Sequence, residues 1–366
     1  MLNSFILHKK YKMQDSIHNK LQSILLIPDE EILKNKITAL ADDIKFHKAE
    51  DETDLQYTTN LQQDLPEHIN HLMDPEKNLH QSIRTGFSNL DDLIKGFGAG
   101  ELIVIGARPG MGKTQLMVNL ALNISEHCPV AYLSLDLAKA ALINRILSCK
   151  TQLSQNQFTS GDVSKNATTL LQNALEDLKK NQLFINDKSV YHIPTLRNFI
   201  VKNCTENNVK VFFIDYLQLI GSITNYKHRL QEISAVCSAL KNFAREYNVT
   251  IVISSQLSRA VETRGGSKKP QLSDLRDSGA IEEEADKVIF IWRPEYYNMT
   301  QDEMGNNYSG YTELIVAKNR TGKVGSAGLT IDYNFSHFTN FKEFKKDFEF
   351  NSERKAILDS HSDRPF

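Results

Sequence analysis

Cysteine is scarce in this sequence of 366 residues. The only four are Cys128, Cys149, Cys204 and Cys237. No two of them form a Cys-x-x-Cys pair, and no histidine stands at zinc-ligand spacing from them. A disulfide scaffold is therefore excluded, and nothing points to a zinc site. We expect buried free thiols, as is usual in a reducing cytoplasm.

Long apolar runs are also missing. No stretch of about 18 apolar residues occurs, so we expect no membrane span and no membrane partner. The N-terminus has a short apolar patch but no small-residue cleavage site, so it does not resemble a secretory signal. These absences predict a cytoplasmic location.

Neither sign of charge is in clear excess. The chain has 43 lysines and arginines against 45 acidic residues, which gives a formal net charge of −2. Any contact with nucleic acid must therefore depend on a local basic surface rather than on the charge of the whole chain. The length and the 40% hydrophobic content predict a large core domain with an appendage.

Both ends of the chain lack the pattern of a large core. Residues 1–83 read as a small helical segment and linker, because apolar residues recur at helical spacing before an acidic, polar stretch at 47–64. A second weak helix is predicted at 66–73. Residues 342–366 form a charged tail that we expect to be flexible.

Short apolar strands alternate with amphipathic helices over residues 84–341. This alternation predicts an α/β domain with a mostly parallel sheet and helices on both faces, and the closely spaced last strands favour an antiparallel edge. The predicted strands are Leu102–Ile105, Val130–Leu135, Leu183–Ile185, Val209–Ile214, Thr250–Ser254, Lys287–Trp292, Glu313–Ala317 and Leu329–Asp332. The predicted helices include Lys113–Glu126, Thr168–Lys180 and Arg229–Tyr247.

A glycine-rich loop joins the first of these strands to a helix. The loop is Ala107, Arg108, Pro109, Gly110, Met111, Gly112, Lys113 and Thr114. In a P-loop the backbone amides surround phosphate oxygens, the lysine binds the outer phosphates and the hydroxyl binds Mg²⁺. The strict pattern begins with glycine, where this chain has alanine. The loop predicts ATP or GTP binding, and the alternative is a generic glycine-rich turn.

A carboxylate ends another apolar strand. Asp215 follows Lys210–Ile214, at the sheet edge where ligands bind in such folds. We expect it to hold the metal ion's water shell, although such strand residues often serve packing alone.

A cluster of basic residues surrounds Gly265 and Gly266. Its members are Arg259, Arg264, Lys268, Lys269 and Arg276. A flexible basic loop without aromatic residues suits contact with a phosphate backbone without sequence preference. The alternative is a mobile, solvated loop.

Several motifs, in order, resemble one family. They are Thr85-Gly-Phe-Ser-Asn-Leu-Asp-Asp-Leu, the glycine-rich loop, Leu133-Ser-Leu-Asp-Leu, Ile214-Asp-Tyr-Leu-Gln-Leu-Ile, Ser254-Ser-Gln-Leu-Ser-Arg, Leu275-Arg-Asp-Ser-Gly-Ala-Ile-Glu-Glu-Glu-Ala-Asp and Ala317-Lys-Asn-Arg-Thr-Gly. Over about residues 84–340 the chain resembles the C-terminal motor domain of the bacterial replicative DNA helicases (DnaB type). The resemblance implies a RecA-like core, a hexameric ring, ATP and Mg²⁺, and movement along single-stranded DNA.

The resemblance also implies roles for single residues. Lys113 and Thr114 match the cradle pair, and Asp215 matches the metal-side acid. Gln256 matches the residue that senses the γ-phosphate. Lys318 and Arg320 match the basic pair that reaches a neighbour's nucleotide, with Arg320 as the arginine finger. Arg276, Asp277 and Gly279 match the loop that contacts DNA in the pore.

Two departures from the family pattern qualify these expectations. Asp136 stands where the family has a glutamate that acts on the attacking water, and its shorter side chain predicts slower hydrolysis. Residues 1–83 are too short for the usual N-terminal collar, which leaves a primase or loader partner open. The alternatives are a RecA-like, DNA-stimulated ATPase without unwinding activity and a weakly hydrolysing nucleotide-binding scaffold or loader.

Overall fold

The computed structural model describes most of the chain after residue 81. The described ranges are 82–160, 165–188, 191–221, 229–275, 278–301, 304–332 and 337–342, with scattered helical positions between 32 and 70. Most of the predicted N-terminal helical segment, the tail after 342, and both Arg276 and Asp277 lie outside the described residues. The proposed division into three segments stays a prediction.

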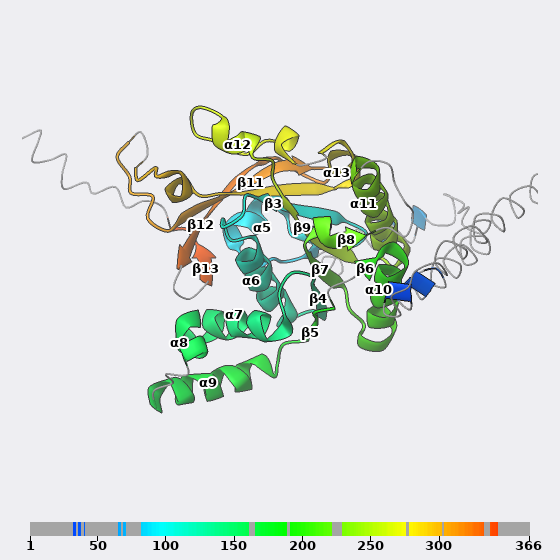
Figure 1. Cartoon of the computed structure of the whole chain (residues 1–366), viewed down its shortest axis with the longest axis horizontal. Helices are drawn as coiled ribbons and strands as arrows, with labels where there is room; N and C mark the ends of the chain where they lie inside the picture. Colours follow the sequence, from blue (N-terminus) through cyan, green and yellow to red (C-terminus); the bar gives the residue numbers. More distant parts are fainter. Residues whose placement is uncertain are drawn as a thin grey trace, which may run out of the picture.

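A nine-stranded sheet forms the centre of the molecule (Figure 1), in the order β13-β12-β11-β10-β3-β9-β7-β4-β5. Its strands are β3 (Leu102–Ala107), β4 (Val130–Ser134), β5 (Leu183–Asn186), β7 (Val211–Asp215), β9 (Thr250–Gln256), β10 (Lys287–Trp292), β11 (Tyr311–Asn319), β12 (Gly325–Asp332) and β13 (His337–Asn340). The run from β5 to β10 is parallel, and β10 to β13 are antiparallel. The predicted parallel sheet with an antiparallel edge is confirmed.

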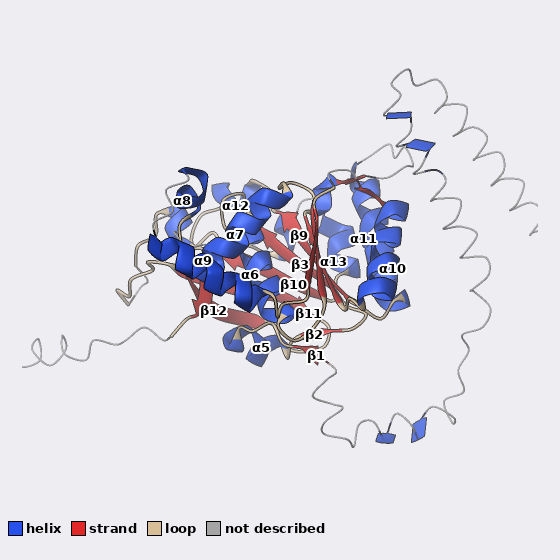
Figure 2. Cartoon of the chain, turned by 90° about the horizontal axis from the view of Figure 1, so that it is seen from below, coloured by secondary structure: helices blue, strands red, loops and turns tan. Residues whose placement is uncertain are grey.

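Helices cover both faces of this sheet (Figure 2). Side chains of β3 alternate between the two cores: Ile103 and Ile105 pack with α6 and α7, whereas Leu102 and Val104 pack with α10, α11 and α13. This explains the uninterrupted apolar run, since a strand buried on both faces needs no polar positions. From residue 82 on, the α-helices of the described ranges are α5 (Ser88–Ile94), α6 (Lys113–Ser125), α7 (Lys139–Thr151), α8 (Gln155–Ser160), α9 (Lys165–Leu178), α10 (Ile193–Asn207), α11 (Arg229–Glu246), α12 (Ala260–Thr263) and α13 (Ser278–Glu284).

Four short strands lie outside the main sheet. β1 (Ser82–Ile83) pairs with β2 (Phe97–Gly98), and β6 (Tyr191–His192) pairs with β8 (Ile220–Gly221). The 3₁₀ turns are Leu217–Leu219, Leu272–Asp274 and Pro294–Tyr297. Within the described ranges, the helices are all too short or too polar to span a bilayer.

The four cysteines are free, as expected, but they are not equally buried. Cys149 and Cys237 are buried, whereas Cys128 and Cys204 are only half-buried. The prediction of four buried thiols is therefore wrong for two of them, because Cys128 lies in the turn after α6 and Cys204 lies near the end of α10. Burial raises the pKa of Cys149 to about 11 and that of Cys237 to about 12, so both are thiols at neutral pH.

Because of the sheet topology, the predicted site residues lie at two opposite edges of the sheet, which are the carboxyl and the amino ends of its parallel strands. At the carboxyl edge Ala107 is in register with Gln256, and Ser134 with Asp215. β11 runs antiparallel to β10, so Lys318 lies beside Val288, near the amino end of the parallel strands. The length of β3 separates the two edges by roughly 16 Å, at about 3.3 Å for each residue.

Candidate active site

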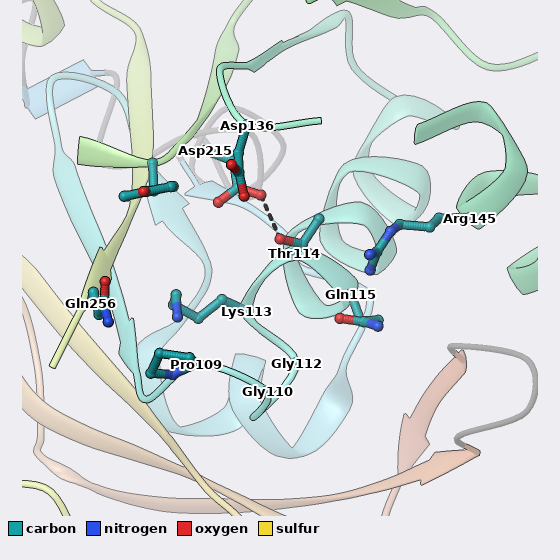
Figure 3. Close-up of a pocket in the computed structure, with 11 residues that line it drawn as sticks. Pro109, Gly110, Gly112, Lys113, Thr114, Gln115, Asp136, Arg145, Asp215 and Gln256 are labelled. Atoms are coloured by element: carbon teal, nitrogen blue, oxygen red, sulfur yellow. Dashed lines mark hydrogen bonds between the residues drawn. The ribbon is translucent and has the colours of Figure 1, made fainter. Parts of the chain in front are cut away.

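A cavity of about 390 Å³ opens at the carboxyl edge of the sheet (Figure 3). It combines the glycine-rich loop and the start of α6 with the ends of β7 and β9 and one face of α7. Its lining residues are Pro109, Gly110, Gly112, Lys113, Thr114, Gln115, Asp136, Arg145, Asp215, Tyr216 and Gln256. The sequence motifs at Lys113, Thr114, Asp136, Asp215 and Gln256 thus meet in one cavity.

Two glycines give the loop its shape. Gly110 and Gly112 have φ values of 80° and 96°, a left-handed conformation that strains other residues. α6 begins directly after Gly112, so its free amide groups and positive end face the cavity. Ala107 is buried at the end of β3, and the alanine in place of the usual glycine fits there.

Lys113 turns back over the loop. Its Nζ donates to the carbonyl oxygen of Ala107 at 3.1 Å and to that of Arg108 at 3.5 Å. Burial lowers the pKa of Lys113, and the nearby Asp215 partly offsets this effect. A half-buried ammonium beside a helix N-terminus can donate hydrogen bonds to the outer phosphates of a nucleotide.

Thr114 and Asp215 lie side by side. The Thr114 hydroxyl donates to Asp215 Oδ2 at 2.7 Å (Figure 3), and the Tyr132 hydroxyl donates to the same oxygen at 3.2 Å. Ser254 donates to Oδ1. These contacts fix a buried carboxylate beside a hydroxyl, and this donor pair fits Mg²⁺ that keeps most of its waters and binds phosphate oxygens. Among the described residues there is no cluster of three or more histidine, cysteine or acidic side chains that could hold a metal ion.

Arg108 points away from the cavity. Its Nε donates to Glu262 Oε1 at 2.8 Å, and its Nη1 donates to the Leu257 carbonyl oxygen at 2.7 Å. The hydrogen bond from Arg108 is the main reason that the pKa of Glu262 is lowered. Arg108 and the buried Met111 therefore do not line the cavity, although the whole loop was predicted to bind nucleotide. They attach the loop to the protein on the side away from the cavity.

Several polar residues in or near the cavity, Tyr216 among them, were not singled out from the sequence. Arg145 reaches the cavity from α7, and Gln115 lines it from α6 (Figure 3). Gln218 joins the ends of β7 and β9, because its Nε2 donates to Ser255 Oγ at 3.0 Å and its Oε1 accepts from the Gln256 amide at 3.4 Å. Arg145 lies nine positions after Asp136. That spacing carries no recognisable chemical signal by itself.

Lys318 and Arg320 lie at the opposite edge. Lys318 donates to the carbonyl oxygens of Glu282 and Glu283, and Arg320 donates to Glu283 O and to Asp286 Oδ1. Burial lowers the pKa of Lys318, and the neighbouring charge of Arg320 adds to the shift. Neither side chain belongs to the cavity of its own chain.

The predicted DNA-binding residues are partly engaged with acids. Arg264 pairs with Asp274, and Lys269 pairs with Glu313 at 2.7 Å while lying over the Trp292 ring. Lys268 lies over the Tyr297 ring, 5.3 Å from its centroid. Gly279 is an exposed residue of α13, with open space where a side chain would stand. Their contact with DNA stays a prediction.

Comparisons with known proteins show which family shares this architecture. The sequence matches the family described as DnaB-like helicase C terminal domain over residues 82–340. Relatives include a probable replicative DNA helicase of Trieres chinensis, which is 38% identical over 71% of this chain and 57% of that protein. The replicative DNA helicase DnaB of Rickettsia prowazekii is 35% identical over 71% of this chain and 58% of its own length.

Solved structures agree with the fold. One solved ATPase domain superposes with a TM-score of 0.70 and 27% identity, covering 78% of this chain and all of that domain. A DnaB-like replicative helicase, solved in a study of its interactions with primase, gives a TM-score of 0.71 and 25% identity over 91% of this chain and 77% of that one. The expected RecA-like core is thereby confirmed. The chain spans little more than half the length of the curated relatives, and over that span it belongs to the DnaB-like helicase C-terminal domain family.

Proposed function

We propose that this chain is the ATP-driven motor of a replicative-type DNA helicase. It hydrolyses ATP with Mg²⁺ at the interfaces of a ring, hexameric by analogy, and moves along single-stranded DNA. One observation carries the proposal. The cavity at the carboxyl edge is lined by side chains suited to bind phosphate, a metal ion and the attacking water, whereas the cations Lys318 and Arg320 lie at the other edge. A head-to-tail neighbour supplies those cations to the cavity and completes the site.

The chain's own residues have distinct tasks in this reaction. Lys113 and the loop amides bind the β- and γ-phosphates, while Thr114 and Asp215 hold Mg²⁺, which neutralises developing charge when bound. Asp136 faces the cavity as the carboxylate that orients and deprotonates the attacking water. Gln256, at the end of β9, lines the cavity and is the residue proposed to contact the γ-phosphate. α12 connects it to the basic residues from Arg264 onward.

Arg320 of a neighbour stabilises the charge of the transferring phosphoryl group. A cation supplied from outside makes hydrolysis depend on the alignment of two chains, and such groups strongly increase turnover. Arg145 adds a second positive charge from α7 within the chain itself. A primase or loader partner enters the proposal only as something that residues 1–83 would bind.

An ATPase assay with and without single-stranded DNA tests the proposal, together with displacement of a strand from a forked duplex. We expect DNA-stimulated hydrolysis, strand displacement, and loss of both in Lys113→Ala. Stimulated hydrolysis without displacement would support the RecA-like ATPase instead. ATP binding without hydrolysis would support a scaffold or loader, for which Asp136 is the specific argument.

A further inference from the structure

Asp286 lies at the junction between α13 and β10 and is 7% exposed. Its carboxylate accepts hydrogen bonds from two elements and from the turn after β11. The donors are the Leu102 amide of β3 at 2.8 Å, Lys241 Nζ of α11 at 2.6 Å and Arg320 Nη1 at 3.4 Å. Its backbone takes part as well, since the Arg320 amide donates to the Asp286 carbonyl oxygen at 2.9 Å. The residue therefore ties the end of β11 to the body of the sheet.

The end of α13 provides the other acceptors for the basic pair. Arg320 Nη2 donates to the Glu283 carbonyl oxygen, and Lys318 Nζ donates to the carbonyl oxygens of Glu282 and Glu283. Free carbonyls at a helix C-terminus carry partial negative charge and attract cations. Asp286 adds a full negative charge to the same place.

The burial of the two partners is unequal. The Asp286 side chain is 10% exposed and that of Arg320 is 46% exposed. A pair between two exposed, flexible side chains would fix neither of them. Here Leu102 and Lys241 already immobilise the carboxylate, so the guanidinium is held at a defined place while one side stays open to a partner chain.

We propose that Asp286 is a positioning residue for Arg320, and that it orients the guanidinium for contact with the nucleotide of a neighbouring chain. This inference rests on the proposed function, because Arg320 does not reach the cavity of its own chain. Asp286 itself does not line the cavity. A precise placement of this kind matters for rate, since an error of about 1 Å in a group that contacts the reacting atoms can lower turnover by about a hundredfold.

The test uses mixtures of full-length variants at constant total protein, with DNA-stimulated ATP hydrolysis as the readout. Lys113→Ala removes the lysine of the nucleotide cavity but keeps Lys318 and Arg320. Arg320→Ala keeps the cavity but removes the arginine that a neighbouring chain would receive. Asp286→Asn keeps the size of the side chain and an oxygen for the Leu102 amide. We expect it to lower hydrolysis at least tenfold, to leave affinity for a fluorescent ATP analogue within about twofold, and to regain activity with Lys113→Ala but not with Arg320→Ala.

Two results would overturn the positioning role alone. One is unchanged hydrolysis in Asp286→Asn, and the other is recovery with Arg320→Ala, which would place the defect in the variant's own cavity through Leu102 and β3. If Lys113→Ala and Arg320→Ala do not complement each other, no site is shared between chains and the proposed function fails with it. Should Asp286→Asn not fold, as judged by thermal denaturation, Lys241→Gln removes another anchor of the carboxylate. The same mixtures are then measured with Lys241→Gln. We expect its hydrolysis to fall about threefold, and we expect it to regain activity with Lys113→Ala but not with Arg320→Ala.

Discussion

Asp136 faces the cavity with one methylene less than the glutamate of the family pattern. The residue follows β4 and is exposed in the cavity that also contains Lys113 and Asp215. A carboxylate that must reach a water attacking the γ-phosphate is sensitive to such a change, because proton transfer needs hydrogen-bond contact. We therefore expect the reach of this side chain to affect the rate of ATP hydrolysis rather than the affinity for ATP.

Asp136→Glu is expected to increase DNA-stimulated ATP turnover by about tenfold or more, because the carboxylate gains about an ångström of reach. Steady-state hydrolysis at saturating ATP measures the change, and KM should stay within about twofold. Asp136→Asn is the matched control and should lose turnover, since an amide does not accept the proton. Equal turnover in the wild type and Asp136→Glu would show that the backbone already compensates for the shorter side chain.

Lys113 predicts a pH dependence of nucleotide binding. Burial lowers the pKa of its ammonium in the nucleotide-free protein, and a bound polyanion raises it again. Binding therefore takes up a proton at alkaline pH, and affinity falls as the pH rises toward the usual lysine value of about 10.4. Titration of a non-hydrolysable ATP analogue between about pH 7 and pH 10 measures this fall. Lys113→Arg should bind with little pH dependence, because a guanidinium does not titrate in this range, and an equal fall in both proteins would exclude Lys113 as the cause.

At the scale of elements, the apolar strands were the most predictable part of the fold. β10 was predicted with its observed bounds, because a strand buried on both faces leaves an apolar run with sharp ends. β13 was missed, since His337–Asn340 is a short edge strand with alternating polar residues. α7 and α10 were not named either, and α10 is interrupted in its pattern by Pro194, which the first turn of a helix accepts.

The contiguous parts of the site were more predictable than the dispersed ones. The loop at 107–114 carries its geometry in its own sequence, and Asp215 is marked by the strand before it. The acids that pair with Arg264 and Lys269 come from Asp274 and Glu313. The linear sequence does not show which acidic residues will lie beside a basic cluster. The pairing of these lysine and arginine side chains with acids could therefore not be predicted.

A buried ion pair joins β10 to the turn before β3. Lys287 Nζ contacts both carboxylate oxygens of Glu101, and the two side chains are 2% and 10% exposed. Lys287→Met should lower the free energy of unfolding by about 3 kcal/mol, because it leaves the Glu101 charge buried without its cation. Chemical denaturation measures the loss. The double variant with Glu101→Gln should recover part of it, and a loss in Lys287→Met below about 0.5 kcal/mol would show that Glu101 finds enough solvent or other donors.

At the scale of the whole molecule, the proposed function needs two groups of residues that lie on opposite edges of a single sheet, the cavity at one edge and Lys318 and Arg320 at the other. The strand register fixes this separation, since β10 is parallel to β3 and antiparallel to β11. If the chain assembles into the proposed ring, its overall charge of −2 would be no obstacle to DNA binding, because the ring would bring together one local basic segment from each chain.

DNA binding is expected to weaken steeply with salt if the basic segment contacts phosphates. Lys268→Ala and Arg276→Ala should each reduce the slope of log affinity against log salt concentration by about one, as expected for a lost phosphate contact. Fluorescence anisotropy with labelled single-stranded DNA at several salt concentrations measures the slope. Lys180→Ala, just after α9, is the control and should leave the slope unchanged. Binding that is unaffected by both substitutions would remove the segment from the DNA path.

The contact between Arg108 and Glu262 bears on how a chemical event becomes movement. Arg108 belongs to the phosphate loop, and Glu262 belongs to α12, which connects Gln256 to the segment that begins at Arg264. The guanidinium donates hydrogen bonds to Glu262 of the helix at 2.8 Å and to the carbonyl oxygen of Leu257, the residue after β9, at 2.7 Å. It therefore links the loop directly to both. If the loop moves on phosphate release, these hydrogen bonds would pass the displacement to α12 and so to the segment that begins at Arg264, which is the predicted DNA contact.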